Sequence, residues 1–393
     1  MILRMPDRTE ESPPRPSRPG ELTAFRSDTV DRIRAAGNVW KLPGGELLLP
    51  RVFGFCRGVE RAMAMLEQAV TGEAGKGTRF FLLGEIIHNP WVNDYFRRRG
   101  VRILTAAEIA ELEKHVSPSD CAVIPAFGVP LPIERRLGAI GCRLVDTSCG
   151  DVRRLWAWAQ RAARSGYGIA IFGRARHDET VVTKSRLADF GGQYVVLGSL
   201  DEVRGFCAML AGKPPSGAFA QAFGPQATNA ASIEPFLRLA QVSQTTMLYD
   251  DTMQVRQMIE EVFVRRFGRG QLQRRLQFEP TVCRATQARQ TAAVELCQGR
   301  PDLVIVVGGF GSSNTRHLYE LARSYAPAFF IEDVRAIQSE SELRTVDIAT
   351  NKPLTIRHWL PPRRPVRIAI LAGASSPEIV VGHILERLAE FLR

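Results

Sequence analysis

Three cysteines occupy the same position relative to a strand and a helix in three separate parts of the sequence. Cys56 follows an apolar run at 47–53 and precedes an amphipathic helical segment. Cys149 follows the strand-like RLVD and precedes a helix predicted from about 152 to 164, and Cys283 follows a short strand and precedes another helix. Ligands of open α/β sheets bind at the carboxyl ends of strands, and a helix N-terminus favours an anionic sulfur. The pattern therefore predicts three α/β units, each with a thiol at its ligand-binding edge.

These three cysteines are too far apart in the sequence for a local zinc site, and they suit one thiolate from each of three units meeting at a common centre. Taken singly, each is also compatible with a small buried hydrophobic residue, but the repeated context favours ligation. The other four cysteines have different surroundings, and we expect them to be buried: Cys121, Cys142, Cys207 and Cys297.

The length of 393 residues and the hydrophobic content of 45% allow two or three α/β units. We predict a disordered extension at 1–20 within an N-terminal segment 1–40, and α/β units at 41–145, 146–250 and 251–393. No apolar run reaches the ~18 residues of a membrane span, and no signal peptide is visible. We therefore expect a cytoplasmic protein with reduced thiols and no membrane partner.

The formal net charge is +11 and the sequence pI is about 9.7. Such a charge is compatible with nucleic acid, an anionic substrate or an acidic protein partner. The arginines are scattered through predicted helices, without interleaved aromatic residues or a nucleic-acid recognition motif. We therefore predict no nucleic-acid partner. Most of these arginines should be solvated, and docking of an acidic electron carrier is the more specific alternative.

Two glycine-rich turns follow apolar strands and carry hydroxyl side chains at the start of a helix. One contains Gly308, Gly309 and Gly311 and continues into Ser312, Ser313 and Asn314, and the other contains Ser375. Glycines allow close approach, and exposed N–H groups at a helix N-terminus bind anions. The first turn lacks the lysine of a Walker loop and the glycine spacing of a dinucleotide site. A diphosphate without a nucleotide is therefore the better match.

Four further polar residues lie at predicted strand ends, and each has a structural alternative. His88 in IIHNP is a possible anion contact or a capping residue, and Phe127 in PAFG is expected to line the same cavity. His177 and Glu179 in RHDET could bind phosphate and deliver a proton, or they could simply begin a helix. Thr245 in SQTT could contact a ligand or cap the following helix.

Eight motifs, in order along the chain, resemble the 4-hydroxy-3-methylbut-2-enyl diphosphate reductase (LytB) family, over about residues 52–392. They are GFCRGVERA, EIIHNPWVN, DTSC, RHDET, SQTT, TVCRATQARQ, GGFGSSNTRHL and AGASSPE. Several stretches of the sequence, such as PAFG, QTTML and SSNT, resemble the cyanobacterial and plant branch of that family.

The resemblance implies a three-lobed α/β fold with a pseudo-threefold arrangement around a central [4Fe-4S] cluster. It implies Cys56, Cys149 and Cys283 as the cluster ligands, which leaves one iron open to the hydroxyl oxygen of the substrate. Glu179 would supply protons, and Thr245 would lie near the hydroxymethyl end of the substrate. The implied diphosphate contacts are His88, His177, Ser312, Ser313, Asn314 and Ser375.

The implied reaction is reductive dehydroxylation of (E)-4-hydroxy-3-methylbut-2-enyl diphosphate to isopentenyl and dimethylallyl diphosphate, the last step of the methylerythritol phosphate route. Electrons would arrive singly from ferredoxin or flavodoxin. The sequence departs from the family pattern at Phe127, where many members have histidine, and at Gly150, where the family has proline after the cysteine. A non-catalytic protein that binds the cluster on the same fold is the alternative, and a nucleotide-dependent oxidoreductase fits poorly because the glycine spacing fails.

Overall fold

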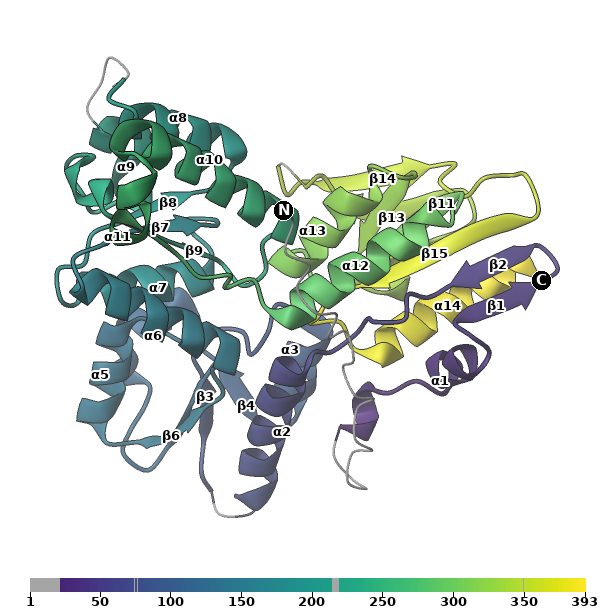
Figure 1. Cartoon of the computed structure of the whole chain (residues 1–393). Coiled ribbons are helices and arrows are strands. Elements are labelled where there is room, and N and C mark those ends of the chain that lie inside the picture. The colour runs from purple at the N-terminus through teal and green to yellow at the C-terminus, as the bar shows by residue number, and fades with distance from the viewer. Residues whose placement is uncertain (1–21, 74, 76, 214–218, 349) are drawn as a thin grey trace.

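The computed structural model describes residues 22–393 except 74, 76, 214–218 and 349. The predicted disordered extension at 1–20 lies outside the described residues. Three sheets of four or five strands, each covered by helices, form three lobes around the middle of the molecule (Figure 1). The predicted α/β class is confirmed, and the pseudo-threefold symmetry stays a prediction.

The first sheet has the strand order β4-β3-β5-β6, and all its strands are parallel. Its strands are β3 (Phe80–Leu82), β4 (Val101–Ile103), β5 (Cys121–Ile124) and β6 (Arg143–Asp146). Its helices are α2 (Arg57–Gly72), α3 (Pro90–Arg98), α4 (Ala106–Ala110) and α5 (Leu131–Ile140). The apolar face of α2 packs on β3, β4 and β5, which places the start of α2 beside the ends of these strands.

The second sheet is also parallel, in the order β10-β9-β7-β8. Its strands are β7 (Gly168–Phe172), β8 (Tyr194–Leu197), β9 (Leu239–Ser243) and β10 (Leu276–Phe278). The helices of this lobe are α6 (Gly150–Arg164), α7 (Asp178–Ala188), α8 (Leu200–Leu210), α9 (Phe219–Ala227), α10 (Tyr249–Phe267) and α11 (Leu272–Arg275). Every residue of β7, β8 and β9 is buried, as expected of parallel strands covered on both faces.

The third sheet has the order β1-β2-β15-β11-β12, in which only the β1–β2 pair is antiparallel. Its strands are β1 (Val39–Leu42), β2 (Gly45–Leu48), β11 (Leu303–Val307), β12 (Ala328–Ile331) and β15 (Val366–Ala372). Its helices are α1 (Asp28–Ala35), α12 (Arg284–Gln298), α13 (Ser313–Ala322) and α14 (Glu378–Leu392). The hairpin of β13 (Glu342–Val346) and β14 (Pro353–Arg357) lies beside β12.

The sheets divide the chain differently from the predicted units. Residues 41–48, which we placed in the first unit, belong to β1 and β2 of the third sheet, where β2 pairs with β15. Residues 251–278, which we placed in the third unit, form α10 and β10 of the second lobe. An apolar run before a glycine turn and a helix has the same pattern whether the strand pairs with its neighbour in sequence or with a distant strand. The pattern therefore located the elements but not their pairing.

The helices begin where the sequence provides caps. Asn89 caps α3 ahead of Pro90, and Ser199 and Ser312 cap α8 and α13 through their side-chain oxygens. In the part of the chain that the structure describes, no helix combines the length and the apolar character needed to cross a bilayer.

Candidate active site

The three predicted cysteines are the N-cap residues of three helices, one from each lobe. Cys56 caps α2, Cys149 caps α6 and Cys283 caps α12, and all three have extended backbone conformations. The Sγ atom of Cys56 accepts a hydrogen bond from the backbone N–H of Val59 at 3.5 Å, and that of Cys283 accepts one from the N–H of Thr286 at 3.3 Å. Each sulfur therefore lies at the positive end of a helix dipole, which favours a thiolate.

The sulfurs also lie close to one another. A Cβ atom added to Gly58 would lie 2.8 Å from Sγ of Cys149 and 3.7 Å from Sγ of Cys56, so only glycine leaves room for both. Burial, with a smaller contribution from negative charge at Cys56, raises the pKa of Cys283 to about 12. Burial also raises the pKa of Cys149, with a further contribution from Cys56. Figure 1 shows the starts of α2, α6 and α12 facing one another in the middle of the molecule.

The donor set fits the [4Fe-4S] cluster implied by the motifs. Buried thiols with raised pKa values are stable as thiolates only beside positive charge, which the irons of a cluster provide. Among the residues that the structure describes, no group of three or more His, Cys, Asp or Glu side chains is arranged to hold a single metal ion.

The backbone ties each cysteine to a loop that carries another predicted site residue. The N–H of Cys56 donates to the carbonyl of Ala374, beside Ser375, at 3.3 Å. The N–H of Cys149 donates to the carbonyl of Ala126, beside Phe127, at 2.8 Å. The N–H of Cys283 donates to the carbonyl of Thr245 at 3.0 Å. The cysteines and the predicted substrate contacts therefore belong to one site.

Glu179 is a buried carboxyl group next to Thr245. Both the N–H and the hydroxyl of Thr245 donate to Glu179, to Oε1 and Oε2 respectively, at 2.6 Å each. Burial raises the pKa of Glu179 to about 7, against the lowering effect of these two hydrogen bonds. At neutral pH the group is therefore divided between its acid and its base forms, as a proton donor requires.

His88 and His177 come from different lobes and meet edge to face, with ring centroids 5.7 Å apart. Phe127 stacks on His88, with centroids 4.4 Å apart, so it lies beside the predicted site residues. The Nδ1 atom of His177 accepts a hydrogen bond from the N–H of Glu179 at 3.3 Å. Burial lowers the pKa of His177 to about 3. The ring is therefore neutral, and its proton is on Nε2, where it can donate to a ligand.

The serine-bearing turns of the third lobe lie against the loop of His88. The hydroxyl of Ser375 donates to Oγ of Ser312 at 3.2 Å, and a Cβ atom on Gly309 would come within 2.3 Å of the carbonyl oxygen of His88. Asn314 is buried at the start of α13, and neither atom of its amide has a hydrogen-bond partner among the described residues. Hydroxyls, a helix N-terminus and an amide without a partner are groups that suit the binding of an anion.

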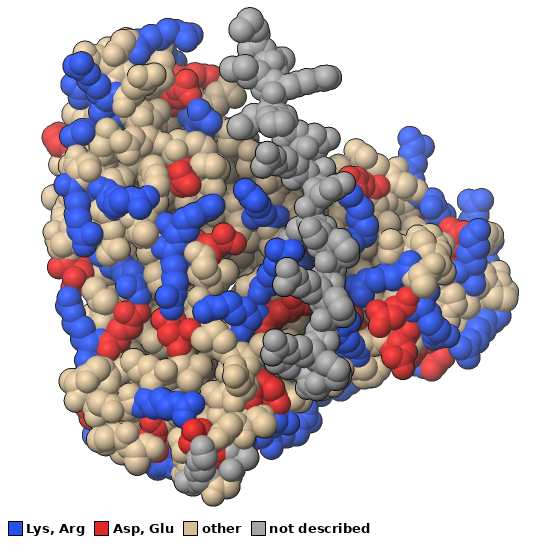
Figure 2. Space-filling model, turned by 60° about the horizontal axis from the view of Figure 1, so that its bottom comes forward, with Lys and Arg blue, Asp and Glu red and all other residues tan. Residues whose placement is uncertain are grey.

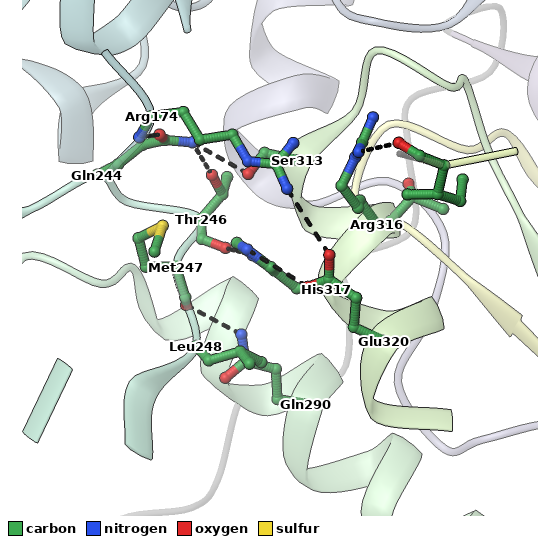
Figure 3. A network of polar contacts seen from close by, with 12 residues as sticks. Arg174, Gln244, Thr246, Met247, Leu248, Gln290, Ser313, Arg316, His317 and Glu320 are labelled. Carbon is green, nitrogen blue, oxygen red and sulfur yellow. Dashed lines mark hydrogen bonds and ion pairs between the residues drawn. The ribbon is translucent and has the colours of Figure 1, made fainter. Parts of the chain in front are cut away.

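Sequence reasoning missed Gln244, which joins the second and third lobes. Its Nε2 donates to Oγ1 of Thr246 at 2.6 Å and to Oγ of Ser313 at 3.1 Å, and its Oε1 accepts from the N–H of Arg174 at 3.1 Å. Figure 3 shows the surrounding network, in which Nδ1 of His317 donates to the carbonyl of Thr246 at 2.7 Å. The available signal was the position of Gln244 at a strand end, directly before Thr245.

Arg289, also missed, holds the loop that leads to Cys56. It is buried, and its Nε and Nη2 donate to the carbonyl oxygen of Gly54 at 3.2 and 2.8 Å. An arginine inside a helix gives no sequence signal of such a contact, because its acceptor is a backbone group from a distant segment.

A comparison with protein families gives a match to the family described as "LytB protein", over residues 47–389. The chain belongs to the LytB family. Among its relatives, proteins named 4-hydroxy-3-methylbut-2-enyl diphosphate reductase come from Thermosynechococcus vestitus and a Synechococcus strain. The Thermosynechococcus protein is 31% identical, over 93% of this chain and 89% of the relative. The Synechococcus protein is 32% identical, over 94% of this chain and 92% of the relative.

Two solved structures share the fold of this LytB protein. One is described as (E)-4-hydroxy-3-methyl-but-2-enyl diphosphate reductase, with a TM-score of 0.53 and 22% identity, and it covers 88% of this chain and 99% of its own. The other is E-1-hydroxy-2-methyl-but-2-enyl-4-diphosphate reductase from Plasmodium falciparum, with a TM-score of 0.62 and 21% identity over 86% of each chain. The predicted resemblance to the LytB family and its cyanobacterial members is confirmed.

Proposed function

We propose that this LytB protein reduces (E)-4-hydroxy-3-methylbut-2-enyl diphosphate to isopentenyl and dimethylallyl diphosphate. The observation that carries the proposal is the meeting of three thiols, one buried carboxyl group and an anion site at one place, with a contribution from every lobe. Family relatives bear the name of this reductase. In the overall reaction a C–O bond is replaced by a C–H bond, two electrons and two protons are consumed, and water is released.

Cys56, Cys149 and Cys283 would hold the [4Fe-4S] cluster. When bound, this cluster supplies single electrons and one iron without a protein ligand, which can act as a Lewis acid. Thr245 orients Glu179 through two hydrogen bonds of 2.6 Å. With a pKa of about 7, Glu179 carries a proton in a large fraction of molecules and can donate it to the departing hydroxyl.

The diphosphate would bind between the lobes. Ser312, Ser313 and Ser375 offer hydroxyl groups, and the start of α13 offers backbone N–H groups. The amide of Asn314, buried without a partner among the described residues, would gain one from the ligand. His177 would donate to the diphosphate through Nε2. His88, next to it, would be the contact from the first lobe.

The electrons would come from ferredoxin or flavodoxin, since both are acidic one-electron carriers and this chain has a net charge of +11. The cytoplasmic location expected from the sequence stays a prediction.

The test is anaerobic purification followed by turnover with a chemical reductant. We expect a brown protein with about four irons per chain that converts the hydroxylated diphosphate. Cys283→Ser should lose iron and activity, whereas Cys207→Ser, which changes a buried cysteine of α8 far from the site, should keep both. Brown protein without turnover would support the non-catalytic alternative, and an iron-free wild type would contradict both.

A further inference from the structure

Arginines occur in the first two turns of the three helices that carry the cysteines, and two of them stand at the first helical position, where the helix dipole disfavours positive charge. Arg57 is the first residue of α2, Arg284 is the first residue of α12, and Arg154 lies in the second turn of α6. Positive charge at the N-terminus of a helix is unfavourable, because it lies beside the positive end of the helix dipole. Departures from such local rules are expected where a residue serves function rather than folding.

These three arginines, which we call the arginine rim, are exposed and lack acidic partners. Within the described part of the chain, no ion pair joins Arg57, Arg154 or Arg284 to a carboxylate. Their neighbour Arg153 behaves differently, because it pairs with Asp146. The nearby acids are Glu60, which acts on Arg57 only at longer range, and Asp151, a half-buried residue whose charge acts on Cys149 and Cys283.

Each residue of the arginine rim lies within five residues of one of the three cysteines. Arg57 and Arg284 directly follow their cysteines, and the starts of the three helices face one another (Figure 1). The neighbouring Arg61 links two of these elements, because its Nη1 donates to the carbonyl of Ser148, next to Cys149, at 3.3 Å. On the face that Figure 2 shows, basic and acidic side chains are interspersed. The rim is distinguished by its position and its missing partners rather than by the charge of the whole molecule.

We propose that the arginine rim is the docking face for the acidic one-electron carrier protein. The inference rests on the proposed function, since only a reductase needs single electrons delivered to this site. Unpaired guanidinium groups attract and orient a carboxylate-rich partner, and they place its redox centre against the thiols. The competing explanation is that the same arginines only offset the negative charge of the thiolates.

The experiment compares two triple variants of the cluster-loaded protein with the same net charge. The test variant is Arg57→Gln/Arg154→Gln/Arg284→Gln. The control removes three exposed arginines elsewhere, as Arg161→Gln/Arg269→Gln/Arg363→Gln. Each protein is assayed with reduced acidic ferredoxin and with the small cationic reductant methyl viologen. Ferredoxin binding is measured separately by calorimetry, and iron content and the midpoint potential of the cluster are recorded.

We expect the test variant to bind ferredoxin about tenfold more weakly or worse, and to lose a similar factor in kcat/KM for ferredoxin. Turnover with methyl viologen and the midpoint potential should stay at wild-type values. Raised salt should reduce the wild-type rate with ferredoxin towards that of the variant. Equal ferredoxin binding by the test variant and the control would overturn the docking proposal. A shifted potential with equal loss for both reductants would favour the competing explanation.

Failure of this proposal is distinguishable from failure of the proposed function. If methyl viologen drives turnover but the test variant binds ferredoxin as tightly as the wild type does, the proposed reductase activity is retained and the docking face lies elsewhere. If no reductant drives turnover in the wild type, the proposed function fails. If the triple variant loads cluster poorly, the single variant Arg154→Gln, whose residue does not adjoin a cysteine, provides the same comparison.

Discussion

Glu179 can be replaced by its amide with little disturbance of its surroundings. In Glu179→Gln, Oε1 still accepts from the N–H of Thr245, and Nε2 can donate to Oγ1 of the same residue. The variant cannot deliver a proton. We expect it to retain the cluster and to lose about 10²- to 10⁴-fold in turnover, measured with a chemical reductant and iron analysis. Turnover at the wild-type rate would remove Glu179 from the mechanism.

The raised pKa of Glu179 also predicts how stability depends on pH. The folded protein binds this proton up to about pH 7, whereas the ordinary pKa is 4.5, so the folded state holds more protons between these values. Stability contributed by the protonated group is therefore lost as pH rises through this window, by up to about 3 kcal/mol. Denaturant titrations at pH 5 and pH 8 should show a smaller loss in Glu179→Gln than in the wild type. An equal loss in both would contradict the raised pKa.

The residues that sequence reasoning found have a signal within their own segment, and those that it missed do not. Cys56 and Cys283 stand out because each lies between a strand and a helix. Gly58 gains its meaning only when Cys149, from another lobe, comes within 2.8 Å of the missing Cβ atom. Gln244 likewise donates to Ser313 of the third lobe, and Arg289 donates to Gly54, 235 residues away in the chain. Contacts across lobes depend on the arrangement of the sheets, which local patterns do not contain.

Helix α6 begins at Gly150, directly after its N-cap Cys149, despite the missing proline. The space around Gly150 is open, because an added Cβ atom would meet nothing within 4 Å. Cys149 has φ −63° and ψ 140°, which suits a residue before proline. Gly150→Pro should therefore stabilise the protein by about 0.4–1 kcal/mol, measured by denaturant unfolding, with unchanged iron content. Gly141→Pro, at a positive φ of 74°, is the destabilising comparison, and loss of stability in Gly150→Pro would show that the start of α6 needs glycine.

The sequence predicted element types better than element pairing. The start of α6 was placed at about 152 and lies at Gly150, within the usual uncertainty of helix ends. Strand β2 was found as part of the run at 47–53, but its partner is β15, not a strand of the next helix-containing unit. Strand pairing over such a distance is decided by how complete sheets pack, so an apolar run alone cannot reveal it.

At the scale of the whole molecule, the site has a contribution from each lobe, so anything bound there links all three. A ligand that binds only the folded state stabilises it, by about 2.7 kcal/mol at 100 times its Kd. The midpoint temperature of thermal unfolding should therefore be higher for the cluster-loaded protein than for the cluster-free protein. It should increase again when the diphosphate is added. The alcohol without its diphosphate is the control and should have little effect. An unchanged midpoint with the diphosphate would contradict its binding to the folded protein.

The pairing in the third sheet determines the order in which the three sheets can form during synthesis. Its strand β2 pairs with β15, and Arg367 reaches back to Glu46 across 321 residues of chain. A growing polypeptide on the ribosome can close the first sheet after residue 146 and the second after residue 278, whereas the third must wait for β15. Helix α12, which begins at Cys283, packs on that last sheet. Assembly of the proposed cluster would therefore follow translation of β15, and lobes produced as separate chains would lack the complete set of three cysteines.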